Sequence, residues 1–134
     1  LIAEYDLRGA RVDGRVRLLS GGNMQKLILG RVLEAGPDIL VAAQPTRGLD
    51  EGAIAGVHRR LIAARERGAG VLLISEDLDE VIALSDRIRA IVGGRLSPPI
   101  PAERADARLL GLMMAGDWQG AQEIAGQPEA AHAS

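Results

Sequence analysis

Apolar residues recur at two different spacings along this chain, and the spacing separates helices from strands. Between residues 22 and 34 they stand three or four positions apart, which predicts a helix with one buried face. These apolar positions are Met24, Leu27, Ile28 and Val32. Gly36 and Pro37 provide a stop for that helix. The continuous apolar run within residues 38–43 has the length of a strand, and it predicts a strand buried on both faces.

The pattern after this run predicts a helix and a second strand. Asp50 is placed to cap a helix that ends at Gly68, and its apolar residues share one face. Residues 71–74 form another short apolar run. Two buried strands joined by a helix make a right-handed crossover, and the two strands are then parallel.

The C-terminal part predicts smaller elements. Asp77 and Glu80 have the spacing of a capping box, which opens a short helix that ends at about Leu84. Two glycines at residues 93–94 stand between short apolar segments, an arrangement typical of a two-residue β-hairpin. Because residues 97–101 are rich in proline, the second arm of that hairpin is expected to be brief.

A last helix is predicted over residues 105–115. Beyond Gly116 the chain is rich in Ala, Gly, Gln and Glu and has no apolar periodicity. Residues 117–134 are therefore expected to be a disordered tail. The folded region is expected to span residues 1–116.

Composition limits the classes of function. With 134 residues there is room for one domain. The net charge of −2 gives no electrostatic case for binding nucleic acid, and the apolar runs are far shorter than the roughly 20 residues that cross a bilayer. The chain has no cysteine and two isolated histidines, so no metal site is expected. It begins at Leu1, inside an apparent helix, which suggests a fragment of a longer protein.

Ser20, Gly21 and Gly22 open the first predicted helix, and such a sequence can build an anion site. Serine caps the helix, and glycine lets a phosphate approach the backbone closely. The first N–H groups and the helix dipole then point at the anion. The alternative is that these residues form only a turn before an ordinary helix.

Three segments, taken in order, resemble the ATP-binding cassette (ABC) family. Residues 19–23, Leu-Ser-Gly-Gly-Asn, resemble its signature motif, and residues 38–44 resemble its Walker B strand. Residues 47–50, Arg-Gly-Leu-Asp, resemble its D-loop. The sequence around Gln25 is similar to that of importers of simple sugars and nucleosides, in which one polypeptide carries two fused cassettes. The match is best with the second cassette.

This resemblance implies an α/β fold. Residues 1–116 would be the C-terminal portion of a P-loop NTPase domain, with a parallel sheet, crossover helices, a C-terminal β-hairpin and a helix. No Gly-x-x-x-x-Gly-Lys-[Ser/Thr] sequence occurs, so the P-loop itself is absent from this chain.

The resemblance also implies an ATP site that two cassettes share. In the family, each nucleotide lies between the P-loop and Walker B strand of one cassette and the signature helix of the other. The residues that would touch the γ-phosphate of a partner's ATP are Ser20, Gly21, Gly22 and Asn23. Asp50 would reach across the seam as part of the D-loop; by itself it could be a helix cap only. ATP and Mg²⁺ would be held mainly by the partner cassette and by upstream residues.

Three positions depart from the family pattern. Where an aspartate for magnesium and a glutamate for the attacking water are expected, this chain has Ala43 and Gln44. Glu76 stands where the family's switch histidine would be, although by itself it could be a solvated residue ahead of a helix. Gln44 and Glu76 would therefore be degenerate versions of the family's catalytic residues. The chain's own nucleotide site is expected to hydrolyse ATP slowly or not at all.

The expected function is that of an ATP-binding component of an ABC importer for sugars or nucleosides. Its expected partners are a second cassette in the same full-length polypeptide, membrane permease subunits and, indirectly, an extracytoplasmic substrate-binding protein; nucleic acid is not expected. The site of action would be the cytoplasmic face of the membrane. The alternatives are an ABC protein that does not transport, or a truncated fragment without a stable fold.

Overall fold

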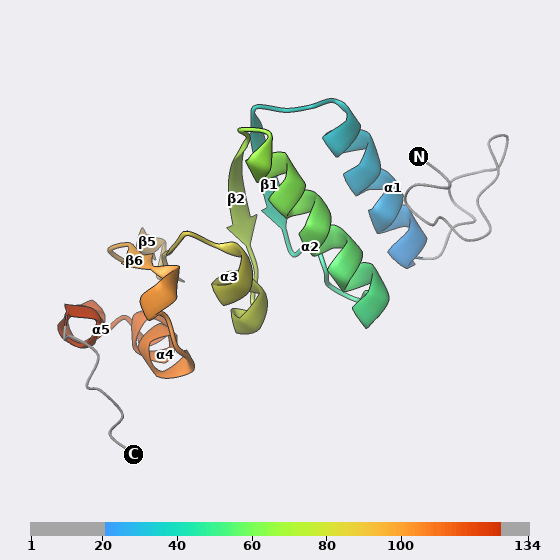
Figure 1. Cartoon of the computed structure of the whole chain (residues 1–134). Coiled ribbons are helices and arrows are strands. Elements are labelled where there is room, and N and C mark those ends of the chain that lie inside the picture. Colours follow the sequence, from blue (N-terminus) through green and yellow to red (C-terminus); the bar gives the residue numbers. More distant parts are fainter. Residues whose placement is uncertain (1–20, 127–134) are drawn as a thin grey trace, which may run out of the picture. The chain divides into compact units, whose positions relative to one another are not determined.

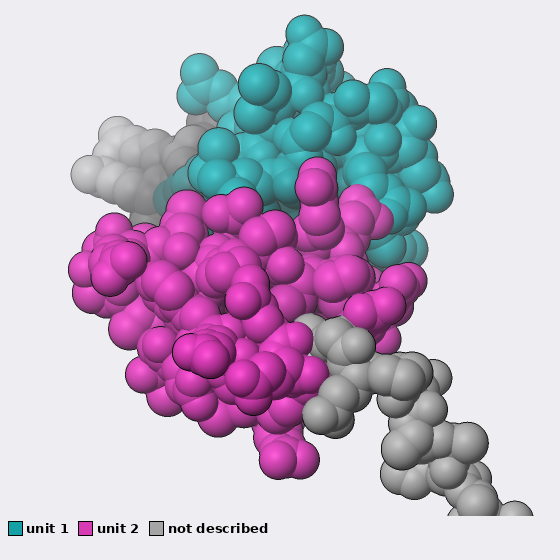
Figure 2. Space-filling view, turned by 90° about the vertical axis from the view of Figure 1, so that its left-hand side faces the viewer, with its two compact units in different colours: residues 1–75 teal, residues 76–134 magenta. Residues whose placement is uncertain are grey.

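The computed structural model describes residues 21–126, which divide into two compact units. Figure 2 shows them in two colours, with the boundary between Ser75 and Glu76. The cap predicted at Ser20 and the end of the predicted tail, residues 127–134, lie outside the described residues.

The first unit contains a strand, helix, strand sequence preceded by one more helix (Figure 1). Its elements are α1 (Gly21–Glu34), β1 (Ile39–Ala43), α2 (Glu51–Glu66) and β2 (Gly70–Ile74). All four agree with the apolar periodicity to within two residues at each end.

β1 and β2 are parallel, as predicted, and pair from Ile39 opposite Gly70 to Ala43 opposite Ile74. The N–H of Gly70 donates to the carbonyl of Asp38 at 2.8 Å, beside the first pair. Beyond the last pair, the N–H of Gln44 donates to the carbonyl of Ile74 at 2.7 Å. Hydrogen bonds therefore hold the ladder at both ends.

The ends of the helices follow from the residues that flank them. Asp50 accepts a hydrogen bond from the N–H of Ala53 at 2.9 Å, which confirms its role as the cap of α2. Gly36 follows α1 with a φ of +59°, a conformation that favours glycine, and its N–H donates to the carbonyl of Leu33 at 3.1 Å.

The sheet of the first unit is buried on one face only. Leu40 and Ala42 are buried, whereas Ile39 is 75% exposed and Val41 is 60% exposed. The prediction that this strand is buried on both faces is wrong for this chain. The residues of α2 that are buried include Val57 and Leu61. Within residues 21–75, no element covers the face of the sheet that carries Ile39 and Val41.

The second unit is built from short elements (Figure 1). They are α3 (Leu78–Leu84), β3 (Arg87–Ile88), β4 (Ile91–Val92), β5 (Arg95–Leu96), β6 (Ile100–Pro101), the 3₁₀ turn η2 (Ala102–Arg104), α4 (Ala107–Ala115) and α5 (Trp118–Gly126). Asp77 caps α3 by accepting a hydrogen bond from the N–H of Glu80 at 3.1 Å, as the spacing of these two residues predicts.

The predicted hairpin forms, and it is part of a longer antiparallel arrangement. β4 pairs with β5 across the two glycines, and β3 pairs with β6. Between these pairs lies Ser97, which is 1% exposed, and its backbone N–H donates to the carbonyl of Ala90 at 2.8 Å. Its hydroxyl accepts from the N–H of Ala90 at 2.9 Å and donates to the carbonyl of Pro98 at 2.9 Å. The proline-rich segment therefore returns to the pairing instead of leaving it.

The expectation of a disordered tail from residue 117 is wrong for α5 (Trp118–Gly126). Asp117 caps this helix by accepting from the N–H of Gly120 at 3.0 Å. The indole N–H of Trp118 donates to the carbonyl of Met113 at 3.2 Å, and the guanidinium of Arg95 lies 5.4 Å from the ring centre. Ala121 is 2% exposed and Ile124 packs against the same core, so these two residues and Trp118 dock the helix.

The second unit has one apolar core, to which both C-terminal helices contribute. Its buried members are Ile88, Ile100, Ala102, Leu109, Leu110, Met113 and Ala121. None of the helices in the described part of the chain has the length and apolarity that a bilayer span requires.

Ala121→Asp should destabilise the second unit, because a carboxylate there would be buried without a partner. The expected loss is about 3–5 kcal/mol, the usual penalty for an uncompensated buried charge. Amide hydrogen exchange at Leu109 and Met113 would measure it, since exchange reports local stability. Gln122→Asp, at the exposed neighbouring position, is the control. Equal protection in both variants would contradict the docking of α5.

Candidate functional site

The first turn of α1 lies against the loop that follows β1. A Cβ added at Gly22 would stand 3.3 Å from Cδ2 of Leu49, closer than most real contacts. Gly22 therefore permits this approach, and a larger residue would push Leu49 aside. The first four N–H groups of an α-helix have no acceptor within the helix, so the start of α1 offers donors to an external anion.

Gln25, in the second turn of α1, joins the helix to the same loop by hydrogen bonds. Its side-chain amide donates to the carbonyl of Gln44 at 3.2 Å and to the carbonyl of Pro45. These acceptors lie 19 and 20 residues further along the chain. The helix start and the loop thus form one hydrogen-bonded arrangement.

Gln44 has a φ of +49°, and it is the only residue other than glycine in the described part of the chain with a positive φ. Such a conformation costs about 1–3 kcal/mol and persists only where surrounding contacts enforce it. Here the N–H of Gln44 is bound to β2, and its carbonyl accepts from Gln25 and, at 3.3 Å, from the N–H of Arg47. The chain therefore turns sharply as it leaves the sheet.

The turn continues as a compact loop to α2. Pro45 and Thr46 are buried, and the N–H of Leu49 donates to the carbonyl of Thr46 at 3.1 Å. Asp50 is exposed at the end of the loop, where it caps α2. A D-loop role for Asp50 remains a prediction.

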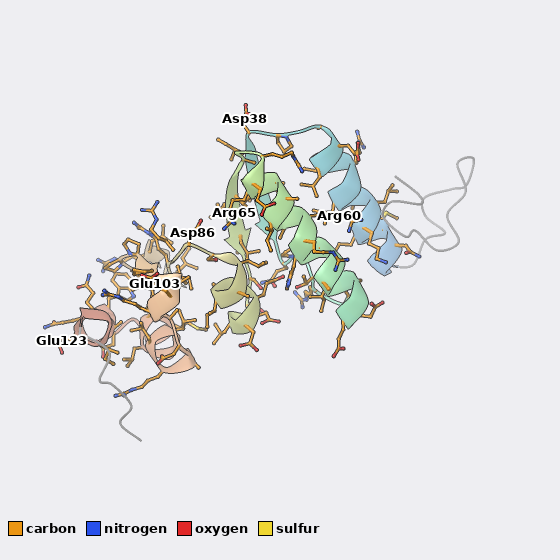
Figure 3. The ribbon with its side chains drawn as sticks, in the orientation of Figure 1. Asp38, Arg60, Arg65, Asp86, Glu103 and Glu123 are labelled. Atoms are coloured by element: carbon orange, nitrogen blue, oxygen red, sulfur yellow. The ribbon has the colours of Figure 1, made fainter. Side chains whose placement is uncertain are left out.

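The structure gives each degenerate position a definite environment. Ala43 ends β1 and is exposed, and its side chain offers a metal ion no oxygen. Asp38 is the residue before β1 and lies at the amino end of this strand (Figure 3), whereas Gln44 follows its carboxyl end. Glu76 is exposed and opens the second unit, immediately before the cap of α3. Catalytic roles for Gln44 and Glu76 remain predictions.

Of the predicted phosphate contacts, Gly21, Gly22 and Asn23 form the first three residues of α1. Ser20 lies outside the described residues. Among residues 21–126 there is no group of three His, Cys, Asp or Glu side chains that could hold a metal ion.

The sequence did not reveal the role of Gln25 or the strained turn at Gln44. Gln25 is the fifth residue of α1, and no distinctive pattern marks such a contact in the sequence. Its partners are backbone carbonyls, which every residue carries. The residue before a proline favours an extended conformation, so the pair Gln44-Pro45 gave no signal for a positive φ.

Known proteins match most of this chain. It is 50% identical over 119 residues to the guanosine import ATP-binding protein NupO of Bacillus subtilis, a match covering 89% of this chain and 23% of that protein. It is 46% identical over 116 residues to the nucleoside import ATP-binding protein NupA of Lactococcus lactis, covering 87% and 23%. The ribose import ATP-binding protein RbsA 1 of Rubrobacter xylanophilus is 38% identical over 117 residues, covering 87% and 23%.

The chain belongs to the ABC family. It corresponds to the C-terminal part of these longer relatives, consistent with the second cassette, and spans about a quarter of their length. No protein-family model matches it.

Solved ABC cassettes share the fold of this chain. The ATP-binding subunit of an ABC transporter has a TM-score of 0.66 at 22% identity, with 91% of this chain and 55% of that chain covered. The cassette MJ1267 has a TM-score of 0.62 at 21% identity, covering 92% and 46%. This ABC chain therefore has the fold of about half a cassette. The sequences that resemble the signature motif, the Walker B strand and the D-loop predicted this fold.

Gln44→Gly should leave the stability of the cassette fragment within about 1 kcal/mol of the unaltered chain. Glycine removes a strain of about 1–2 kcal/mol but costs roughly 0.5–1 kcal/mol in chain entropy. Gln44→Val should lose at least about 1 kcal/mol, because a β-branched side chain tolerates a positive φ poorly. Urea denaturation would compare the two.

The control is Ala43→Val, at an exposed, extended position one residue earlier. It should be tolerated, because valine suits a strand. If Gln44→Val were as stable as Ala43→Val, the strained turn would be contradicted.

Proposed function

We propose that this chain is part of the ATP-binding subunit of an ABC importer for nucleosides or simple sugars. In this proposal its α1 tip completes the ATP site of a partner cassette. Support comes from three relatives named as import ATP-binding proteins, for guanosine, nucleosides and ribose. The geometric support is the close packing of the α1 start on the loop that ends at Asp50.

The observation that carries this proposal is the opening of α1 by two glycines. Gly21 and Gly22 carry no side chains of their own, which favours the close approach of a phosphate to their backbone N–H groups. The helix dipole adds about 0.3–2 kcal/mol toward an anion. In the sequence, Ser20 precedes the two glycines and Asn23 follows them, and both residues have polar side chains. Such a tip suits the terminal phosphate of an ATP that another cassette holds.

The chain's own nucleotide site is proposed to be slow or inactive. The side chain of Ala43 has no oxygen with which to ligate Mg²⁺, and Gln44 can orient a water molecule but cannot remove its proton. General-base assistance is typically worth about 10²–10⁴ in rate. Glu76, when ionised, would repel a γ-phosphate and cannot donate a hydrogen bond to it.

These features together support an asymmetric pair. The partner cassette would hydrolyse ATP with the help of this chain's signature helix, and a nucleotide in this chain's own site would act as a static clamp. ATP and Mg²⁺ would be held mainly by the partner and by residues upstream of this chain. The proposed assembly acts at the cytoplasmic face of a membrane, on permease subunits that receive their cargo from a binding protein.

The 134-residue chain alone should show no micromolar affinity for MgATP. Micromolar binding requires about −8 kcal/mol, far more than one helix start contributes. Isothermal titration calorimetry, with circular dichroism to verify that the chain is folded, would test this. A dissociation constant in the micromolar range would contradict the proposal that ATP is bound mainly by the partner cassette and by upstream residues.

Ser20→Ala in the complete importer should lower both ATP hydrolysis and uptake by about 10–100-fold. That range corresponds to the loss of one hydrogen bond to a charged group. The matched control is Ser85→Ala, which alters a serine at the end of α3, outside the proposed site. Wild-type rates for Ser20→Ala would reject the asymmetric model.

A further inference from the structure

One polar side chain on α1 is fully committed to backbone carbonyls outside its own helix. A glutamine amide carries two N–H donors on its nitrogen. Nε2 of Gln25 uses them on the carbonyls of two consecutive residues, Gln44 at 3.2 Å and Pro45. This amide nitrogen therefore has no donor left for a phosphate, and a ligand-binding role does not fit it.

The two carbonyls belong to the most constrained point of the first unit. Gln44 has its positive φ there, and its N–H is tied to Ile74 of β2 at 2.7 Å. The strained residue is thus held from the sheet on its N–H side and from α1 on its carbonyl side. Strain of this kind persists only while the surrounding contacts enforce it.

The same turn leads directly into the loop that carries Asp50. Gly22, one turn before Gln25 on α1, lies against Leu49 of that loop. Two separate contacts, one polar and one apolar, therefore fix the loop to the start of α1. Arg60 and Arg65, which lie on α2 (Figure 3), take part in neither of these two contacts.

We infer that Gln25 is a positioning residue, which locks the Gln44–Pro45 turn to α1 so that the signature end and the loop to Asp50 engage a partner's nucleotide as one body. This inference rests on the proposed function of the α1 tip. Without the lock, the tip and the loop would adjust separately, and the closed arrangement would form less often. Gln25 acts through the turn and does not touch the nucleotide.

The first test needs no nucleotide. In the complete subunit, Gln25→Met keeps the length of the side chain and removes both donors. Hydrogen exchange at the N–H groups of Arg47 and Leu49, which close the loop, should accelerate about tenfold. Arg31→Met, an exposed change of similar size on the same helix, should leave these rates unchanged. Unchanged exchange in Gln25→Met would overturn the inference.

The second test uses the assembled importer. Gln25→Met should lower kcat for ATP hydrolysis about tenfold, with KM for MgATP within twofold of the unaltered protein. A general structural defect would instead lower the melting temperature and the amount of assembled complex. A rise in KM at constant kcat, or a loss of assembly with unaltered loop exchange, would each overturn the inference.

Gln25→Asn serves as the second variant if Gln25→Met does not fold. It keeps the amide but is one methylene shorter, so it should show an intermediate acceleration of exchange. Failure of the inference can be separated from failure of the proposed function with Ser20→Ala. If Ser20→Ala abolishes hydrolysis while Gln25→Met leaves it intact, only the positioning role is wrong.

Discussion

The parallel hydrogen-bonded pairing of β1 with β2 is the constraint on which the rest of the first unit depends. The ladder continues one step past the strands, because the N–H of Gln44 donates to the carbonyl of Ile74. The chain must then leave the sheet through a strained turn. That turn directs the loop to Asp50, where α2 begins, and presents two carbonyls to Gln25. The first turn of α1 packs on the same loop, so the candidate site follows from the end of one strand.

The second consequence of this pairing is an uncovered apolar face. β1 and β2 turn Ile39, Val41, Leu72 and Ile74 toward a side that no element of residues 21–75 covers. Faces of this kind are stabilised when another layer packs on them. The solved cassettes that share this fold are about twice as long as the region matched. We therefore expect the remaining part of a cassette to cover this face.

Periodicity predicted the elements of the first unit well, because its helices and strands are long enough for a pattern to repeat. Periodicity failed where the position of an element depends on one or two residues. α5 docks through Ala121 and the indole of Trp118, and neither gives a periodic signal; the capping aspartate at position 117 was the available clue. The apolar run of β1 does not by itself reveal that one face is exposed; the available signal was the absence of the P-loop, because the strand that bears it is then absent from this sheet too. The resemblance of residues 19–23 to the signature motif was readable in the sequence, whereas the carbonyl partners of Gln25 were not.

The central claim is that the glycine-opened tip of α1 serves a nucleotide held by another cassette. The most direct measurement is a structure of the complete importer, arrested with ATP in its closed state. The account predicts the N–H groups of Gly21 and Gly22 within about 3 Å of the γ-phosphate oxygens of an ATP bound to the P-loop of the partner cassette. A closed, ATP-bound assembly in which this tip faces solvent, or contacts only protein, would contradict the account.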